Sequence, residues 1–127
     1  MYLLFLQIYK ILSEVFNMVY YEKNAKKRKI DESILIQDVF VRKEFPIDFV
    51  VGTLNGFHGK FVNYKSDKYY YVLDGKAEVM IGDEYFEVVK GDFIHIPKET
   101  IHSINGKVKF IIICSPPYDF NYEEHLD

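Results

Sequence analysis

The sequence has no tryptophan, a single cysteine and no excess of positive charge. Its 16 basic residues face 19 acidic ones, for a formal net charge of -3, so no general positive field is present to gather nucleic-acid phosphates. Cys114 has no second cysteine to pair with, and its apolar run, 110–114, predicts a small buried hydrophobe. These absences disfavour nucleic-acid binding and a disulfide framework, and they favour a reducing, cytoplasmic location.

Aromatic residues are abundant, with 11 tyrosines and 11 phenylalanines in 127 residues. A chain of this length supports one domain with its own core and is too short for two ordinary ones. Tyrosine and phenylalanine favour a β-rich interior. Such flat side chains also suit the wall of a ligand cavity.

Residues 1–21 are the one segment without strand character. Their polar side chains recur every three or four positions, which predicts an amphipathic α-helix, assigned to 1–22. Lys10 and Glu14 would lie near mid-bilayer, which disfavours a membrane span. Three interpretations stay open: packing on the domain or on a second subunit, contact with a lipid interface, or an upstream start site with Met18 as the natural first residue. The polar stripe consists of Gln7, Lys10, Glu14 and Asn17.

Residues 23–32 contain five basic residues followed by Asp31 and Glu32. A basic run this short is typical of a solvated segment. We therefore predict a linker at 23–32 and one domain at 33–127.

From residue 33 onward, short apolar runs alternate with turn residues. The eight predicted strands are 34–41, 49–54, 60–64, 69–73, 77–81, 85–89, 93–96 and 109–114. Glycine-containing separators supply positive φ between many of them. The separators are 55–56, 74–75, 82–83, 90–92 and 105–106. Eight short strands without a helical period predict an all-β jelly roll or sandwich, with residues 118–127 as a strap on its surface.

The glycine spacing resembles that of the cupin superfamily. Gly56 and Gly75 stand at the two ends of the first cupin motif, G(x)5HxH(x)3,4E(x)6G, with three residues between positions 64 and 68. Gly91, Pro97 and His102 follow the second motif, G(x)5PxG(x)2H(x)3N. The resemblance implies a double-stranded β-helix, that is, a jelly-roll barrel, here with the N-terminal α-helical extension. It also implies a homodimer.

Most metal-ligand positions of the resembled motif hold residues of other types in this sequence. Val62, Tyr64 and Lys68 occupy three slots, and only His102 keeps the family's residue type. Strand alternation predicts that positions 62, 64 and 68 face one interior. Valine has no donor atom, and an ammonium group repels a dication. We therefore expect neither a metal nor another cofactor.

The predicted binding residues surround these slots. Lys68 would bind an anionic group, or its stem would lie along the wall with the ammonium in solvent. Hydroxyl, amide and imidazole groups nearby would hydrogen-bond a polar small molecule. Tyr70 is expected on the same strand face as Lys68, with Tyr69 and Tyr71 on the other. The predicted ligand-binding set is Lys68, His102, Tyr64, Tyr70, Asn63 and His95.

Three functions stay open. The favoured one is a metal-free cupin that binds a small polar or anionic metabolite. A metal-independent isomerase or epimerase, with histidine and tyrosine as base and acid, would need a carboxylate to orient the histidine, and no motif strand obviously supplies one. A metal-dependent enzyme requires that Tyr64, His95 or His58 be recruited as ligands. The substrate is left open, because the fold hosts many activities.

Overall fold

The computed structural model describes residues 18–126. The predicted helix at 1–22 lies mostly outside this range, and residues 18–21 are not helical. Within 18–126, no helix is long and apolar enough to cross a bilayer. The elements are η1 (Glu22–Asn24), β1 (Lys26–Lys29), β2 (Ile34–Phe40), β3 (Asp48–Asn63), β4 (Asp67–Ile81), β5 (Glu84–Val89), β6 (Phe93–Ile96), β7 (His102–Ser115), η2 (Phe120–Tyr122) and β8 (Glu123–His125).

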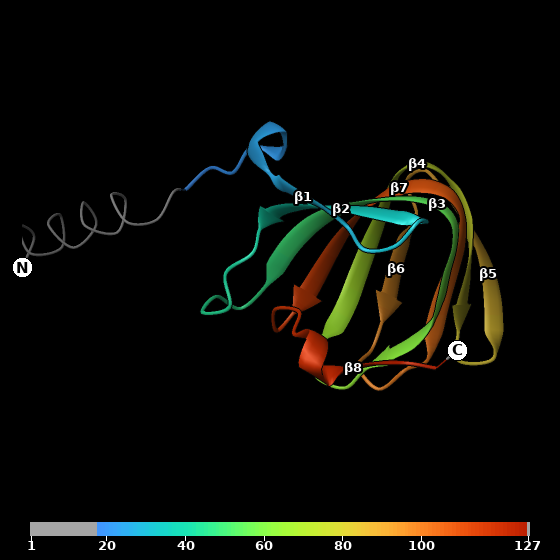
Figure 1. Cartoon of the computed structure of the whole chain (residues 1–127). Coiled ribbons are helices and arrows are strands. Elements are labelled where there is room, and N and C mark those ends of the chain that lie inside the picture. The colour runs from blue at the N-terminus through green and yellow to red at the C-terminus, as the bar shows by residue number, and fades with distance from the viewer. Residues whose placement is uncertain (1–17, 127) are drawn as a thin grey trace, which may run out of the picture.

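The strands form one antiparallel sheet in the order β1-β2-β3-β7-β4-β5. β6 pairs with β4, and β8 pairs with the end of β3. β3, β4 and β7 are long, and they curve together so that the sheet folds over on itself (Figure 1). The all-β prediction is therefore confirmed for the described residues.

Three of the predicted turns lie inside continuous strands. Positions 55–56 belong to β3, 74–75 to β4 and 105–106 to β7, and the glycine of each pair has a positive φ. A Cβ on Gly75 would lie 2.2 Å from the backbone oxygen of Lys107. Glycine at these positions lets a strand bend while it keeps its neighbours, so one strand serves both halves of the barrel.

The predicted linker at 23–32 contains strand β1, so this segment is not an unpaired linker, although three of the four β1 residues are exposed as a solvated segment would be. β1 pairs with β2 over four residue pairs, including Arg28 with Ile36. The Arg28 side chain also forms an ion pair with Asp38 on β2. The basic composition concealed a strand because pairing partners, rather than local hydrophobicity, stabilise an edge strand.

Buried and exposed side chains alternate along the strands, and the buried ones form the core. Tyr70 is buried and Tyr71 is exposed, as the strand period predicts. Cys114 is buried in the apolar cluster, and burial raises the pKa of its thiol to about 12. It therefore packs as a protonated, small hydrophobic side chain.

Candidate functional site

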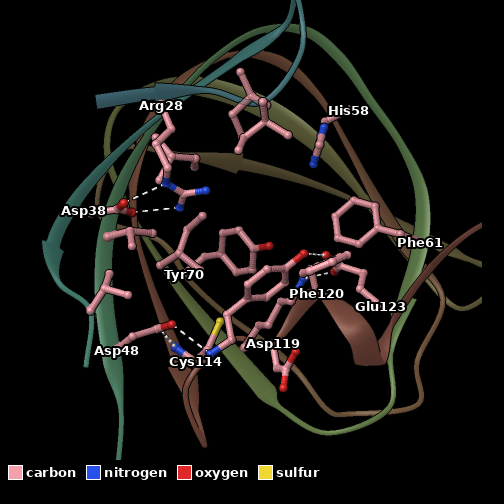
Figure 2. A pocket seen from close by; sticks show the side chains of 18 of the residues that line it. Arg28, Asp38, Asp48, His58, Phe61, Tyr70, Cys114, Asp119, Phe120 and Glu123 are labelled. Atoms are coloured by element: carbon pink, nitrogen blue, oxygen red, sulfur yellow. Dashed lines mark hydrogen bonds and ion pairs between the residues drawn. The ribbon is translucent and has the colours of Figure 1, made fainter. Parts of the chain in front are cut away.

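The interior of the barrel holds a cavity of about 540 Å³. Strands β2, β3, β4 and β7 build its wall, and the C-terminal segment covers one side of it (Figure 2). The apolar wall includes Ile34, Ile36, Val50, Leu54, Phe61, Ile104, Phe110 and Ile112. The charged side chains of the wall are Arg28, Lys43, Lys68, Asp38, Asp48, Asp119 and Glu123. Three basic groups against four carboxylates give the cavity no net positive charge.

A buried ion pair lies at the side that the C-terminal segment covers. Lys68 Nζ is 2.6 Å from Glu123 Oε1, and the two side chains are only 6% and 7% exposed. The Tyr118 hydroxyl donates to the other Glu123 oxygen, and the Lys68 ammonium lies 4.5 Å from the ring centroid of Phe61. Burial and the bond to Glu123 raise the pKa of Tyr118 well above its usual range. The cluster therefore combines a neutral phenol with a compensated charge pair.

Two carboxylates fix the opposite side of the cavity. Arg28 donates to Asp38 through Nε at 2.7 Å and Nη2 at 2.8 Å, and this bond raises the pKa of Arg28. Asp48 accepts backbone N–H groups of Cys114 at 3.0 Å and Tyr118 at 2.8 Å, while burial raises the pKa of Asp48. Asp48 thus connects the C-terminal segment to β7 and β3.

His58 projects from β3 into the cavity wall, with its side chain 15% exposed. Its Nδ1 lies 3.3 Å from Asp31 Oδ2, and its ring stands 4.9 Å from that of Phe61. Burial lowers the pKa of His58, and the carboxylate of Asp31 offsets part of this effect. The imidazole is therefore neutral near pH 7.

Lys68 and Tyr70 are the two predicted binding residues that line the cavity, and Figure 2 shows the hydroxyl of Tyr70 directed inward. His102 is fully buried outside that wall, with its ring 4.2 Å from the ring of Phe61. Its Nδ1–H donates to the Thr100 carbonyl at 3.0 Å, and its Nε2 has no hydrogen-bond partner among the described residues. Burial, followed by the charge of Lys68, lowers the pKa of His102 to about 4.

The other three predicted residues lie apart from the cavity. Asn63 is buried, and its Oδ1 accepts two backbone N–H groups of the turn that follows β3. Tyr64 is 48% exposed and donates to Glu124 at 2.7 Å. His95 is exposed on the outer face, where its ring stacks 4.8 Å from Tyr69. None of these three belongs to the cavity wall.

A bulge in β3 explains why positions 62 and 64 do not share the interior with position 68. β3 carries one more residue than β7 between the pairs His58–Ile104 and Phe61–His102. One extra residue reverses which side chains face inward. Phe61 therefore lines the cavity while Tyr64 is at the surface, and the predicted parity of positions 62 and 64 is wrong.

The donor set does not fit a transition metal. The resembled motif also permits four residues before its carboxylate slot, which would place the first two slots at Phe61 and Asn63 and leave four residues rather than five after Gly56. With Lys68 and His102, these residues supply one imidazole, one amide, one ammonium and one phenyl ring. Among residues 18–126, no three histidine, cysteine or carboxylate side chains are grouped so that they could share an ion.

Several cavity residues escaped the sequence analysis. Glu123 had no local signal, and Arg28 was assigned to a linker, as was Asp31, which contacts His58 from outside the cavity wall. Tyr118 was assigned only to the surface strap at 118–127. His58 was considered as a metal ligand, and its contact with the carboxylate of Asp31 was not expected.

Comparison with known proteins agrees with this architecture. The family model described as Cupin domain matches residues 63–114, from the end of β3 through most of β7. The protein therefore has the fold of cupins, and its match to the family model is confined to residues 63–114. The chain spans about half the length of two curated relatives. An uncharacterized protein of Methanocaldococcus jannaschii is 41% identical over 69 residues, which make up 51% of this chain and 55% of that one. An uncharacterized protein of Streptomyces coelicolor is 26% identical over 57 residues, or 42% and 54% of the two chains.

Solved structures show the same cupin fold. A Streptomyces PAC13 variant with uridine has a TM-score of 0.80 at 18% identity, covering 88% of this chain and 92% of that one. Pac13 is described as a nucleoside dehydratase. KdgF from Halomonas has a TM-score of 0.72 at 18% identity, covering 82% of this chain and 97% of its own. The polyketide cyclase RemF of Streptomyces resistomycificus has a TM-score of 0.69 at 14% identity, with 80% of each chain covered.

Proposed function

We propose that this cupin binds a small polar metabolite in its barrel cavity without a metal. The observation that carries the proposal is an apolar cavity of about 540 Å³ whose wall contains the buried Lys68–Glu123–Tyr118 cluster. Ligand sites of this size combine an apolar wall with a few fixed polar groups that set orientation. The apolar wall suits a ring or another flat body, and the cluster suits hydroxyl and carbonyl groups.

The charge distribution favours an uncharged ligand over an anionic one. Glu123 already compensates the ammonium of Lys68, and Asp38 compensates the guanidinium of Arg28. An added phosphate would meet four carboxylates and no net positive wall. Pac13, whose fold is similar, was solved with the neutral nucleoside uridine, which makes nucleosides a reasonable first class of compound.

A thermal-shift screen tests this proposal with compounds matched in shape and different in charge. Uridine is compared with uridine monophosphate, and D-fructose with fructose 6-phosphate. We expect a neutral member of a pair to raise the melting temperature more than its phosphate, because only a ligand that binds the folded state stabilises it. A panel in which no compound raises the melting temperature would contradict the proposal.

Two tyrosine variants locate the binding event. Tyr70→Phe removes one hydroxyl from the cavity wall, whereas Tyr71→Phe removes one from the exposed face of the same strand. Loss of one hydrogen bond to the ligand should weaken binding about three- to tenfold in Tyr70→Phe and leave Tyr71→Phe unchanged. Equal effects of the two variants would place the ligand elsewhere.

A second candidate function is acid–base catalysis in the same cavity, as in a metal-independent isomerase or epimerase. Among the predicted binding residues, His102 is buried and Tyr64 is exposed, so these two do not form the histidine and tyrosine pair that this chemistry needs. A different histidine, His58, has the orienting carboxylate that this chemistry needs.

We also propose that the protein acts in a reducing cytoplasm and forms a homodimer through the outer face of β4 and β6, where Tyr71 and Phe93 are exposed. Sedimentation velocity of the full chain checks the dimer. Tyr71→Glu with Phe93→Glu should shift the protein to a monomer, and a wild-type monomer would contradict this proposal.

A further inference from the structure

One histidine of the cavity has a carboxylate behind it. Asp31 precedes β2, and one of its oxygens accepts the backbone N–H of Ser33 at 2.7 Å, which fixes the carboxylate within its turn. The other oxygen faces His58 Nδ1 at 3.3 Å. Because a carboxylate only accepts hydrogen bonds, Nδ1 carries the ring proton of the neutral imidazole. Nε2 then holds a free lone pair.

The surroundings keep this lone pair available. His58 is mostly enclosed, and burial lowers its pKa more than Asp31 raises it. The charged and titratable groups around it are Asp31 before β2, Lys68 on β4, Glu123 on β8 and His102 on β7. Figure 2 shows His58 and Glu123 in the wall of one cavity, with the Phe61 ring between them. A neutral base and the ammonium group of Lys68 therefore line the same cavity.

We propose that His58 is the general base of a metal-free proton-transfer site, that Asp31 is its positioning residue, and that the substrate is an uncharged hydroxy-carbonyl compound. The inference rests on the proposed function, since it requires that the cavity admit a small molecule. It deepens that proposal by naming the reacting group and the class of substrate.

The step balances within the substrate and the protein. His58 Nε2 takes a proton from a carbon next to a carbonyl group. The electron pair of that C–H bond forms a carbon–carbon double bond, while the carbonyl π pair moves to oxygen and gives an enolate. An ammonium has three N–H donors, and Glu123 takes one from Lys68. A second donor stabilises the enolate oxygen, and return of the proton to the opposite face of the same carbon gives an epimer. Return of the proton to the neighbouring carbon gives an isomer once the enolate oxygen has gained a proton and the neighbouring hydroxyl has lost one, so neither route needs a co-reactant.

A probe with a carbon acid and a flat ring tests the base before the natural substrate is known. In 5-nitrobenzisoxazole, removal of the ring C–H proton breaks the N–O bond and gives a nitrile and a coloured phenolate. The probe needs only a base in an apolar cavity. Binding of the probe to the full chain is measured separately by saturation-transfer NMR.

We expect the protein to release the phenolate faster than free imidazole at equal concentration. His58→Gln should slow the reaction by at least about tenfold, since a positioned base contributes on the order of a hundredfold or more. His95→Gln is the matched control, because this histidine is exposed on the outer face. Its rate should equal that of the wild type.

The pH dependence of the reaction rate tests the positioning role of Asp31, because a purely structural role would not shift its midpoint. The wild-type rate should fall as acid protonates His58, with a midpoint below the usual histidine value because burial lowers its pKa. Asp31 raises the pKa of His58, so Asp31→Asn should move the midpoint to still lower pH. It should also slow the plateau rate, because Nε2 would then carry the proton in part of the molecules.

The outcomes separate the two proposals. A probe that binds but reacts equally fast with wild type and His58→Gln would show that His58 is not the base, while leaving cavity binding intact. If the probe binds and the pH–rate profiles of the wild type and Asp31→Asn have the same midpoint, Asp31 is not the positioning residue. Absence of binding for the probe and for every screened compound would overturn the cavity proposal and the base assignment together.

Discussion

Glu123→Gln should destabilise the barrel more than its single-atom change suggests. The substitution keeps the size of the side chain and removes its charge. Lys68 Nζ then loses an anionic partner at 2.6 Å, in a place where the lysine side chain is only 6% exposed. The Tyr118 hydroxyl loses a carboxylate acceptor in the same change.

The magnitude follows from the cost of an uncompensated buried charge. Removing one member of a buried pair costs about 3–5 kcal/mol, because the remaining ion keeps its desolvation penalty and loses its attraction. A domain of this size has a total stability of roughly 5–15 kcal/mol. At about 4 °C per kcal/mol, the melting temperature should fall by roughly 12–20 °C.

Urea titration of the wild type and four variants measures the effect. Lys68→Met is the reciprocal single change, and the double variant removes both charges. The double variant should recover at least about 2 kcal/mol relative to the sum of the single changes, because no lone charge remains. Lys29→Met is the exposed control: its ammonium lies 3.2 Å from Glu32, and the two side chains are 60% and 98% exposed. Its cost should be below about 1 kcal/mol.

A loss of stability in Glu123→Gln no greater than that in Lys29→Met would contradict the buried-charge explanation. So would a double variant whose loss of stability equals the sum of the two single losses. Either result would mean that water screens the Lys68–Glu123 pair, and the cluster would then not be a fixed part of the cavity.

Two further predictions concern acid and backbone geometry. The pKa of His102 is lowered to about 4, mainly by burial, so the stability gained by keeping it neutral is complete above about pH 6.5 and is lost as the pH falls toward 4, by about 3 kcal/mol. Urea titrations between these pH values should show a flatter dependence for His102→Leu, and parallel curves would refute the assignment. Gly75→Ala should cost several kcal/mol or prevent folding, because φ is +83° and the new Cβ would lie 2.2 Å from Lys107 O. Gly82→Ala, with φ +61° and no atom within 4 Å, should cost about 1 kcal/mol, and equal losses in the two variants would contradict the steric explanation.

The glycine spacing predicted the fold well because it records backbone requirements. Gly75 needs a positive φ and a close neighbouring strand, and few other residues tolerate both. The same local signal misled about strand boundaries. A positive-φ glycine is typical of a turn, but paired neighbours on both sides of β4 kept the strand continuous.

The site was less predictable than the fold. Strand alternation correctly placed Tyr70 beside Lys68 in the barrel. The spacing of the motif does not reveal the bulge before Phe61. The motif allows either three or four residues before its carboxylate slot, so both registers fit the sequence. An undetected extra residue was enough to turn Tyr64 outward.

The sequence by itself determined the β period, the bends at glycine and the loss of most metal ligands, because each depends on residue type at short spacing. Only the tertiary structure decided the chemistry of the cavity. Glu123 reaches Lys68 across 55 positions, and Asp31 reaches His58 across 27. Pairs this distant in the chain meet through strand register and sheet curvature, which depend on the packing of the whole barrel rather than on any local pattern.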